Sequence, residues 1–264
     1  MCRFIAYLGK PIPLVALVSE PRHSLLRQAS HATEAHSAMQ GDGFGLGWYG
    51  EQGELTLARE ATPAWSDNRL LALCGGVRAG LFFAHVRAAT SAPVAAENCH
   101  PFRLGRHLFM HNGQIGGYEQ LRPELEALLP EHLREHRRGG TDSELLFLLA
   151  MARMALGEDP IQAVLDVFRV VARRVKRAGI SRPLRFSAAL SDGQVLYAFR
   201  LASDAQPPSL YLRGDDNGTV IASEPLDGDR ARWISVPAGS VVRVTRSAYL
   251  LQQADAVALQ DTMF

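Results

Sequence analysis

The sequence predicts an α+β fold in which two mainly antiparallel sheets lie between helical layers, within a single domain spanning residues 1–264. Strand patterns fill the first part of the chain and return in the last part, while two adjacent helical patterns separate them. Asp192-Gly193 is a tight hairpin signal among the later strands. Because 47% of the residues are hydrophobic and no repeat or low-complexity linker interrupts the chain, we expect one substantial core.

The first part of the chain alternates short strands and helices. Residues 2–8 predict a strand that ends at a Gly9-Lys10-Pro11 turn, because β-branched and aromatic side chains give way to glycine and proline. The elements expected next are helices over 14–18 and 24–33, strands over 41–50, 55–59, 80–86 and 108–110, and a brief helix after Asp67, which caps it.

The strand expected over residues 41–50 has glycine at alternate positions. One face of this strand therefore carries no side chains, and glycines in a strand usually mean that something approaches the backbone closely. A flexible loop is the alternative, but the aromatic and leucine side chains between the glycines favour a buried strand.

The rest of the chain predicts helices followed by strands. Helices are expected over 118–129, from Thr141 to Gly157, and from Asp159-Pro160 to Gly179, with apolar residues at helical spacing. Residues 131–138 are mixed in charge and predict a solvated connection. The later strands are expected over 185–191, 194–201, 209–212, 219–222 and 240–244.

Bulk composition limits the classes of partner. A net charge of +1 gives no electrostatic reason to expect nucleic acid, and no stretch has the length of a membrane span. Three irregularly spaced cysteines do not make a disulfide framework, so we expect a reducing, cytoplasmic setting. No cofactor is expected. Cys99-His100 with His85, His107 and His111 matches no common zinc spacing, so no metal site is expected either.

Cys2 is the first candidate for chemistry. Removal of the initiator methionine is easiest before a small residue, so we expect the mature chain to begin at Cys2. A thiol with a pKa of about 8.5 would then share its residue with an α-amine of about 7.7–8.0, which can take the thiol proton. The alternative is an ordinary small apolar residue that opens a strand.

Two polar motifs follow apolar strands and offer the other parts of an acyl-transfer site. Asn112-Gly113 could supply a side-chain amide and a backbone N–H as an oxyanion hole, although Asn-Gly is equally a hairpin signal. Arg87 could hold a carboxylate with two hydrogen bonds, or form a surface ion pair. Asp142 could accept from an ammonium, or simply complement a helix that starts with the capping box Thr141-x-x-Glu144.

If Arg87 binds a carboxylate and Asp142 binds an ammonium, the two residues together form a binding site for the head group of an α-amino acid. The scissile amide would then lie at the far end of the substrate's side chain, which points to glutamine or another γ-glutamyl small molecule as substrate.

These residues resemble the class II, or N-terminal nucleophile, glutamine amidotransferases, in the family's order and over most of the chain. The resemblance implies the four-layer αββα sandwich of the N-terminal nucleophile hydrolases, with Cys2 as nucleophile and base, Asn112 and Gly113 as oxyanion hole, and Arg87, Thr90 and Asp142 binding substrate. The motifs that carry it are Met1-Cys2, His85-Val86-Arg87 with Thr90, His111-Asn112-Gly113 and Thr141-Asp142-Ser143-Glu144.

Within that family, the chain is most similar to small stand-alone members, including the fungal glutathione-degrading amidotransferase subunit and the γ-glutamyl hydrolase of ergothioneine synthesis. The motifs that carry this likeness are Asn98-Cys99-His100-Pro101-Phe102, Gly41-Asp42-Gly43-Phe44-Gly45, Thr62-Pro63-Ala64-Trp65 and Ala222-Ser223-Glu224-Pro225-Leu226.

The departures from the larger members bear on the substrate. Those enzymes usually have Trp after the motif arginine and His after the threonine, whereas this chain has Ala88 and Ser91. The smaller residues predict room for a bulkier leaving group, such as the Cys-Gly of glutathione. Three alternatives stay open: a glutaminase subunit that serves a separate synthase, a partnership with a peptidase-like subunit, and a non-enzymatic binding module. A homo-oligomer is equally open.

Overall fold

The computed structural model describes residues 2–34, 39–89, 92–204 and 206–254. Within these residues the strands form two antiparallel sheets. The first sheet has the order β11 (Ile234–Ser235), β9 (Tyr211–Asp215), β10 (Gly218–Ala222), β1 (Arg3–Pro13), β4 (Arg78–Val86), β2 (Phe44–Tyr49) and β3 (Leu55–Glu60). The second has the order β13 (Tyr249–Gln253), β12 (Ser240–Val244), β8 (Leu196–Ala202), β7 (Arg185–Ser191), β6 (His107–Gln114) and β5 (Phe102–Leu104).

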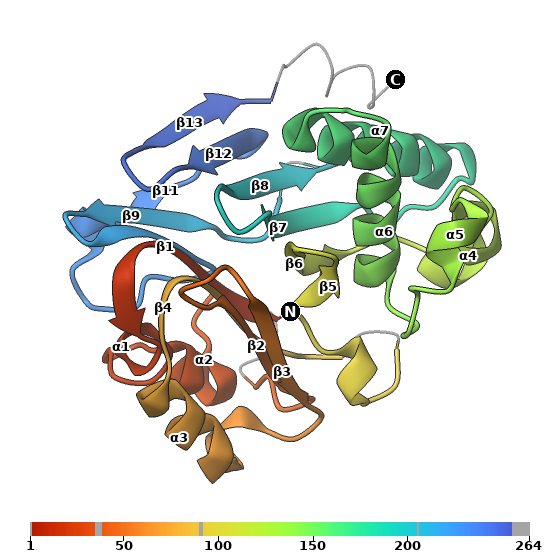
Figure 1. Ribbon diagram of the computed structural model, residues 1–264. Helices are drawn as coiled ribbons and strands as arrows, with labels where there is room; N and C mark the ends of the chain where they lie inside the picture. The colour runs from red at the N-terminus through yellow and green to blue at the C-terminus, as the bar shows by residue number, and fades with distance from the viewer. Residues whose placement is uncertain (1, 35–38, 90–91, 205, 255–264) are drawn as a thin grey trace.

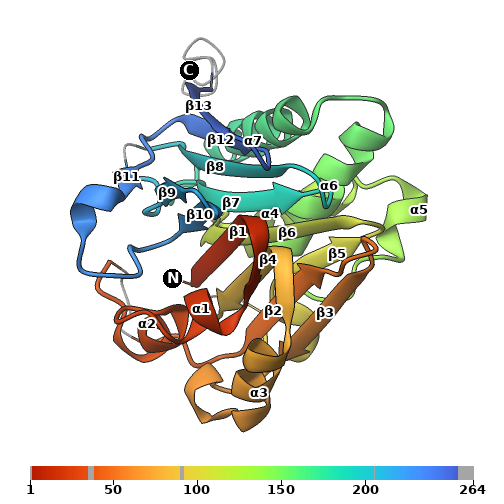
Figure 2. The same cartoon turned by 60° about the vertical axis from the view of Figure 1, so that its left-hand side comes forward.

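Helices cover the outer face of each sheet, so the layers run helix, sheet, sheet, helix (Figure 1). The helices α1 (Val15–Val18), α2 (Leu25–His31) and α3 (Asn68–Gly76) pack on the first sheet. On the second sheet lie α4 (Tyr118–Glu126), α6 (Asp142–Ala155) and α7 (Pro160–Arg177), with the short α5 (Glu131–Arg134) beside them. Figure 2 shows the same two helical layers on opposite sides of the sheets.

Three apolar clusters hold these layers together, one beneath each helical layer and one between the sheets. Strand alternation explains the division, because successive side chains of a strand point to opposite faces. In β1, Ile5 and Tyr7 pack against the helices, whereas Phe4, Ala6 and Leu8 fill the space between the sheets. The predicted arrangement of two sheets between helical layers is therefore confirmed.

The main differences from the expected elements are local. β1 does not end at Gly9-Lys10-Pro11 but continues to Pro13, because Gly9 still pairs with Gly218 and the pairing with β4 resumes at Ile12 after a register shift. The stretch 131–138, expected to be a solvated connection, begins with α5, whose Leu133 is buried. The short strands β5, β11 and β13 are not among the predicted elements.

Helix caps follow the sequence closely. Asp67 accepts hydrogen bonds from the backbone N–H groups of Arg69 and Leu70 at the start of α3, and Asp159 does the same for Ile161 and Gln162 at the start of α7. Such caps satisfy backbone donors that have no partner within the helix.

Candidate active site

Four of the six predicted site residues line one narrow cavity of about 30 Å³ between the sheets: Cys2, Arg87, Gly113 and Asp142. Cys2 precedes β1 and Arg87 follows β4. These strands are antiparallel neighbours that pair Arg3 with Val86, so the two residues lie at the same edge. β6 of the second sheet supplies Gly113, and the first turn of α6 supplies Asp142. The other lining residues are Ala88, Ala89, Ala92, His100, His111, Thr141 and Ser143.

The Cys2 thiol is held by the main chain of Ala88. Its Sγ accepts a hydrogen bond from the Ala88 N–H at 3.3 Å and lies 3.5 Å from the Ala88 carbonyl oxygen, to which it donates. Burial raises the pKa of this thiol, and the Ala88 N–H and the positive charge of Arg87 only partly oppose that effect. The sulfur therefore stays protonated near neutrality and needs a base to become a nucleophile.

Arg87 is buried and fixed from two directions. Its Nη2 donates to the Ala92 carbonyl at 2.9 Å and its Nη1 to the Asp42 carbonyl at 3.4 Å. The main chains of Arg87 and segment 42–43 also exchange two hydrogen bonds, of 2.8 and 3.0 Å. A surface ion pair, the alternative for this arginine, is therefore wrong.

Asp42 is a contributor to this site that sequence reasoning missed. Its Oδ2 accepts from the Ala89 N–H at 2.8 Å, directly after the residues that hold the sulfur and carry the guanidinium. A carboxylate between two glycines, Gly41 and Gly43, next to a glycine-striped strand was the available signal.

Asn112 and Gly113 lie within a strand, so the hairpin alternative is wrong. β6 runs on to Gln114 and pairs Asn112 with Ser187 and Gly113 with Phe186 of β7. The Asn112 side chain is fully buried, and neither its Nδ2 nor its Oδ1 has a hydrogen-bond partner among the described residues. A side chain at Gly113 would collide with the Arg185 carbonyl oxygen, which explains why glycine is required there.

Asp142 is positioned by the start of α6. Thr141 Oγ1 accepts from the Glu144 N–H at 3.1 Å, as the capping box predicts. The Glu144 carboxylate accepts instead from the N–H groups of Arg138 and Gly139, so only half of that motif forms as expected. Asp142 Oδ2 accepts from the Ile115 N–H at 2.8 Å, which fixes the carboxylate in the wall of the cavity.

His111 and Ser143 leave the second oxygen of Asp142 available. His111 Nε2 lies 3.2 Å from the Arg185 carbonyl and must donate to it, so His111 Nδ1 accepts from Ser143 Oγ at 2.8 Å. Burial lowers the pKa of His111, which keeps its ring neutral. Since the Ser143 proton goes to this shorter contact, Asp142 Oδ1, at 3.3 Å from the hydroxyl, retains its capacity to accept.

The glycine stripe of β2 receives segment 99–101, which confirms that something approaches its backbone. A Cβ at Gly43 would collide with the Cys99 sulfur, one at Gly45 with the His100 carbonyl oxygen, and one at Gly47 would lie 2.9 Å from the Pro101 ring. This contact brings the His100 ring to the wall of the Cys2 cavity. The spacing of the glycines revealed the approach, but not the segment that makes it.

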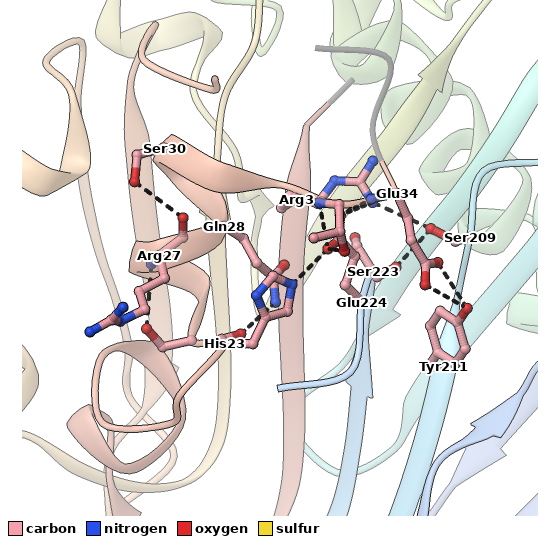
Figure 3. Close-up of polar contacts among 12 residues, drawn as sticks. Arg3, His23, Arg27, Gln28, Ser30, Glu34, Ser209, Tyr211, Ser223 and Glu224 are labelled. Carbon is pink, nitrogen blue, oxygen red and sulfur yellow. Dashed lines mark hydrogen bonds and ion pairs between the residues drawn. The ribbon is translucent and has the colours of Figure 1, made fainter. Parts of the chain in front are cut away.

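A second polar cluster lies around Glu224, and sequence reasoning missed it. Figure 3 shows Arg3 and His23 pointing toward the Glu224 carboxylate, at 3.3 and 2.7 Å. Thr33 donates to this carboxylate with its N–H and hydroxyl, and Glu34 with its N–H. Burial alone would raise the pKa of Glu224, but these hydrogen bonds together lower it to about 2. Glu224 therefore ties both ends of α2 to β1.

Three further expectations concern Thr90, a metal site and a membrane span. Thr90 lies outside the described residues. Within the described ranges, no cluster of three or more His, Cys, Asp or Glu side chains is placed to hold a metal ion. The helices in the part of the chain that the structure describes lack the length and apolarity needed to cross a bilayer.

Comparison with known proteins places this geometry in a family. Residues 14–206 match the family model described as class-II glutamine amidotransferases. The chain is 30% identical to the probable glutamine amidotransferase DUG3 of Saccharomyces cerevisiae, over 95% of this chain and 84% of that one. It is 28% identical to the gamma-glutamyl-hercynylcysteine sulfoxide hydrolase of Mycolicibacterium smegmatis, over 95% and 98%.

A solved structure agrees with both relatives. The glutamine aminotransferase class-II domain protein of Silicibacter pomeroyi superimposes with a TM-score of 0.74 at 33% identity, covering 96% of this chain and 99% of that one. The fold is therefore the four-layer arrangement of the N-terminal nucleophile hydrolases, as the resemblance implied. With its family match, relatives and fold in agreement, this chain belongs to the class II glutamine amidotransferases.

Proposed function

We propose that this protein is an amidohydrolase that cleaves the γ-glutamyl amide of glutamine or of a glutathione-like compound through a thioester on Cys2. The observation that carries the proposal is the shared cavity, in which a thiol, an arginine, a glycine of β6 and a carboxylate meet from four separate segments. The two relatives, one a probable glutamine amidotransferase and one a γ-glutamyl compound hydrolase, support the same bond type.

Removal of Met1 would make Cys2 supply both nucleophile and base. The buried thiol holds its proton, and an α-amine on the same residue can accept it. The sulfur then attacks the γ-carbonyl carbon, and the leaving amine takes the proton from the α-ammonium as the C–N bond breaks. The Asn112 amide and the Gly113 N–H act as the oxyanion hole, and the unpartnered Asn112 side chain supports this role.

The substrate's head group is held by opposite charges. Arg87 binds the α-carboxylate, and Asp142 Oδ1 accepts from the α-ammonium while its Oδ2 stays bound to the Ile115 N–H. The resemblance to the family implies that Thr90 also binds the substrate. Because the cavity is narrow, substrate entry requires it to widen. Ala88, Ala89 and Ala92 line it from a segment that forms neither strand nor helix.

Ala88 favours substrates with a large leaving group. It lines the cavity directly beside the sulfur, where larger amidotransferases usually carry a tryptophan. A glutaminase subunit that delivers ammonia to a separate synthase is the alternative, and a peptidase-like partner that consumes the released dipeptide is compatible with the main proposal.

Comparing kcat/KM for glutamine, glutathione and other γ-glutamyl amides tests the proposal. We expect release of glutamate from at least one γ-glutamyl amide, with glutathione-like compounds preferred over glutamine, and loss of all of it in Cys2→Ala. Turnover of glutamine alone, rising when a synthase is added, would favour the ammonia-delivering subunit. Hydrolysis that survives Cys2→Ala would exclude the thioester.

A further inference from the structure

A second cavity, of about 580 Å³, lies between α4 and the chain that follows it as far as Gly139. Three arginines line it, Arg122, Arg134 and Arg137, and we call it the arginine pocket. Among the described residues, Glu126 is the one carboxylate in its lining. Three guanidinium groups therefore face a single carboxylate, and the lining has a surplus of positive charge. The volume is that of a small-molecule site.

The contacts of the three arginines hold them in place and leave donors free. Glu126 lies 2.8 Å from the Arg122 Nε and 3.1 Å from the Arg137 Nε, so the two guanidinium groups share one carboxylate. Arg134 donates from its Nε to the Leu129 carbonyl at 3.2 Å, and it has no carboxylate partner among the described residues. The Nη atoms of Arg122 and Arg134 donate no hydrogen bond to the part of the chain that the structure describes.

Arg137 carries a charge that the protein compensates poorly. Its side chain is 9% exposed, and its Nη2 donates to the Tyr118 hydroxyl at 2.6 Å. Its Nη1 is buried without a hydrogen-bond partner among the described residues. A cation that is withdrawn from water and incompletely paired is costly, and it attracts an anion more strongly than an exposed cation does. An anion in the arginine pocket would offset this cost.

The arginine pocket is distinct from the Cys2 cavity. Gly139 lines the first and Thr141 lines the second, and no described residue lines both. The arginines of the pocket are therefore not part of the site proposed for the γ-glutamyl head group, and the cleavage chemistry gives them no task.

We propose that the arginine pocket binds a phosphate group, either as the free ion or as part of a small organic molecule. A guanidinium group matches two phosphate oxygens with parallel hydrogen bonds, and Arg122 and Arg134 have the Nη atoms to donate them. A phosphate monoester carries about 1.5–2 negative charges near pH 7, which fits the surplus charge of the lining. The cavity is larger than a phosphate ion, so it has room for an organic part beside Pro123 and Ala127.

Calorimetric titration of the whole protein tests this site. Inorganic phosphate and phenyl phosphate are titrated separately in phosphate-free buffer at neutral pH, with ionic strength held constant by sodium chloride. The variants are Arg122→Gln, Arg134→Gln and Glu126→Gln. Arg177→Gln is the matched control, because it removes the same charge from a side chain that is 73% exposed and does not line the pocket. Thermal unfolding confirms that each variant is folded.

The wild type should bind one phosphate saturably. Arg122→Gln and Arg134→Gln should each weaken binding by about tenfold or more, the usual effect of losing a hydrogen bond to a charged group. Glu126→Gln should bind more tightly, because it removes the carboxylate that competes for two of the arginines. Arg177→Gln should bind as the wild type does. Tighter binding of phenyl phosphate would identify an organic phosphate as the ligand, and equal affinities would identify the free ion.

Three results would overturn the inference. The first is that neither probe binds the wild type saturably. The second is binding that persists unchanged in both Arg122→Gln and Arg134→Gln, which would place the ion elsewhere, for example at Arg87. The third is an equal loss of affinity in Arg177→Gln, which would assign the effect to general surface charge. None of these results bears on hydrolysis at Cys2, so the proposed function stands or falls separately.

Discussion

Two buried carboxylates near the start of β1 have opposite hydrogen-bonding states. Glu224 receives five polar contacts from Arg3, His23, Thr33 and Glu34, and both of its oxygens are used. Asp142, in the cavity that faces Cys2, has one oxygen bound to a backbone N–H and the other within 3.3 Å of a hydroxyl whose proton is engaged elsewhere.

This difference in hydrogen bonding distinguishes polar groups that stabilise the fold from polar groups that can bind a ligand. A fully paired carboxylate stabilises the segments around it, whereas a buried group with spare capacity costs stability until something binds. We therefore infer that the Glu224 carboxylate is structural and that the Cys2 cavity is functional, because His100 in its wall and Asn112, the residue before Gly113, are unpartnered among the described residues. This assignment predicts that substitutions in the two regions affect different quantities.

The largest expected effect is in the cavity. Cys2→Ala should lower turnover of γ-glutamyl amides by at least about 10⁴-fold, because no other group replaces the attacking sulfur. The midpoint of thermal unfolding should change little, since the substitution removes a single sulfur atom that bonds to one residue, Ala88. Initial rates and thermal unfolding of the same preparation measure both, and Cys2→Ser is the conservative companion.

Glu224→Gln should show the opposite pattern, with a large loss of stability and a small change in rate. It leaves the Arg3 guanidinium buried without an anion, so the free energy of unfolding should fall by about 3–5 kcal/mol, measured by urea denaturation. The rate of the folded enzyme at 25 °C should stay within about tenfold, the effect of at most about 1.4 kcal/mol. Glu34→Gln is the control in the same segment, and its partly exposed carboxylate should cost about 1 kcal/mol or less. An unchanged free energy of unfolding in Glu224→Gln would contradict the structural role assigned to the Glu224 cluster.

Asn112→Ala tests whether an unpartnered group serves catalysis. Loss of one oxyanion donor should lower kcat by about 10²–10³-fold, with KM little changed. Since the amide has no partner among the described residues, its removal should leave stability unchanged or slightly raised once the lost volume is accommodated. Steady-state kinetics and urea denaturation decide this. A normal kcat with a large loss of stability would place Asn112 with the structural cluster.

The decrease in the free energy of unfolding at acid pH should depend on Glu224. Its pKa falls from 4.5 to about 2 on folding, so its ionised form contributes about 3 kcal/mol that is present above pH 4.5 and lost as the pH falls toward 2. Urea denaturation of wild type between pH 5 and pH 2 should show this loss. In Glu224→Gln the corresponding part of the slope should be absent. Parallel pH curves for the two proteins would contradict the depressed pKa.

The smallest effect concerns the substrate. Ala88→Trp restores the bulk usual in larger amidotransferases, so kcat/KM for glutathione should fall about tenfold or more relative to that for glutamine. Steady-state rates with both substrates measure the ratio. Ala89→Trp, on the next residue of the same wall, controls for bulk alone. An unchanged ratio in Ala88→Trp would remove the argument from the small residue.

Local chemistry made much of this molecule predictable. Asp67 and Asp159 cap the expected helices because capping depends on three or four consecutive residues. Cys2, Arg87, Gly113 and Asp142 could be named because their order resembles a family. The glycine stripe showed that a close approach had to occur at 43–47.

What could not be predicted depends on pairing between distant segments. The Asn112-Gly113 turn signal gave way to a ladder with β7, and Gly9 stayed in its strand because β10 pairs with it. Neither partner is visible from a local window. The Arg3–Glu224 ion pair joins residues from opposite ends of the chain, so no local stretch of sequence contains both partners.

The central claim is that Cys2, as the terminal residue, is the nucleophile. Its most direct test is intact-mass analysis of the purified protein before and after incubation with a γ-glutamyl electrophilic analogue. Burial raises the pKa of the Cys74 thiol to about 12 and that of Cys99 to about 11, so both should stay unlabelled. We predict a chain lacking Met1 that gains one label, located on Cys2. A label on Cys74 or Cys99, no label, or equal labelling of a chain that retains Met1 would contradict the account.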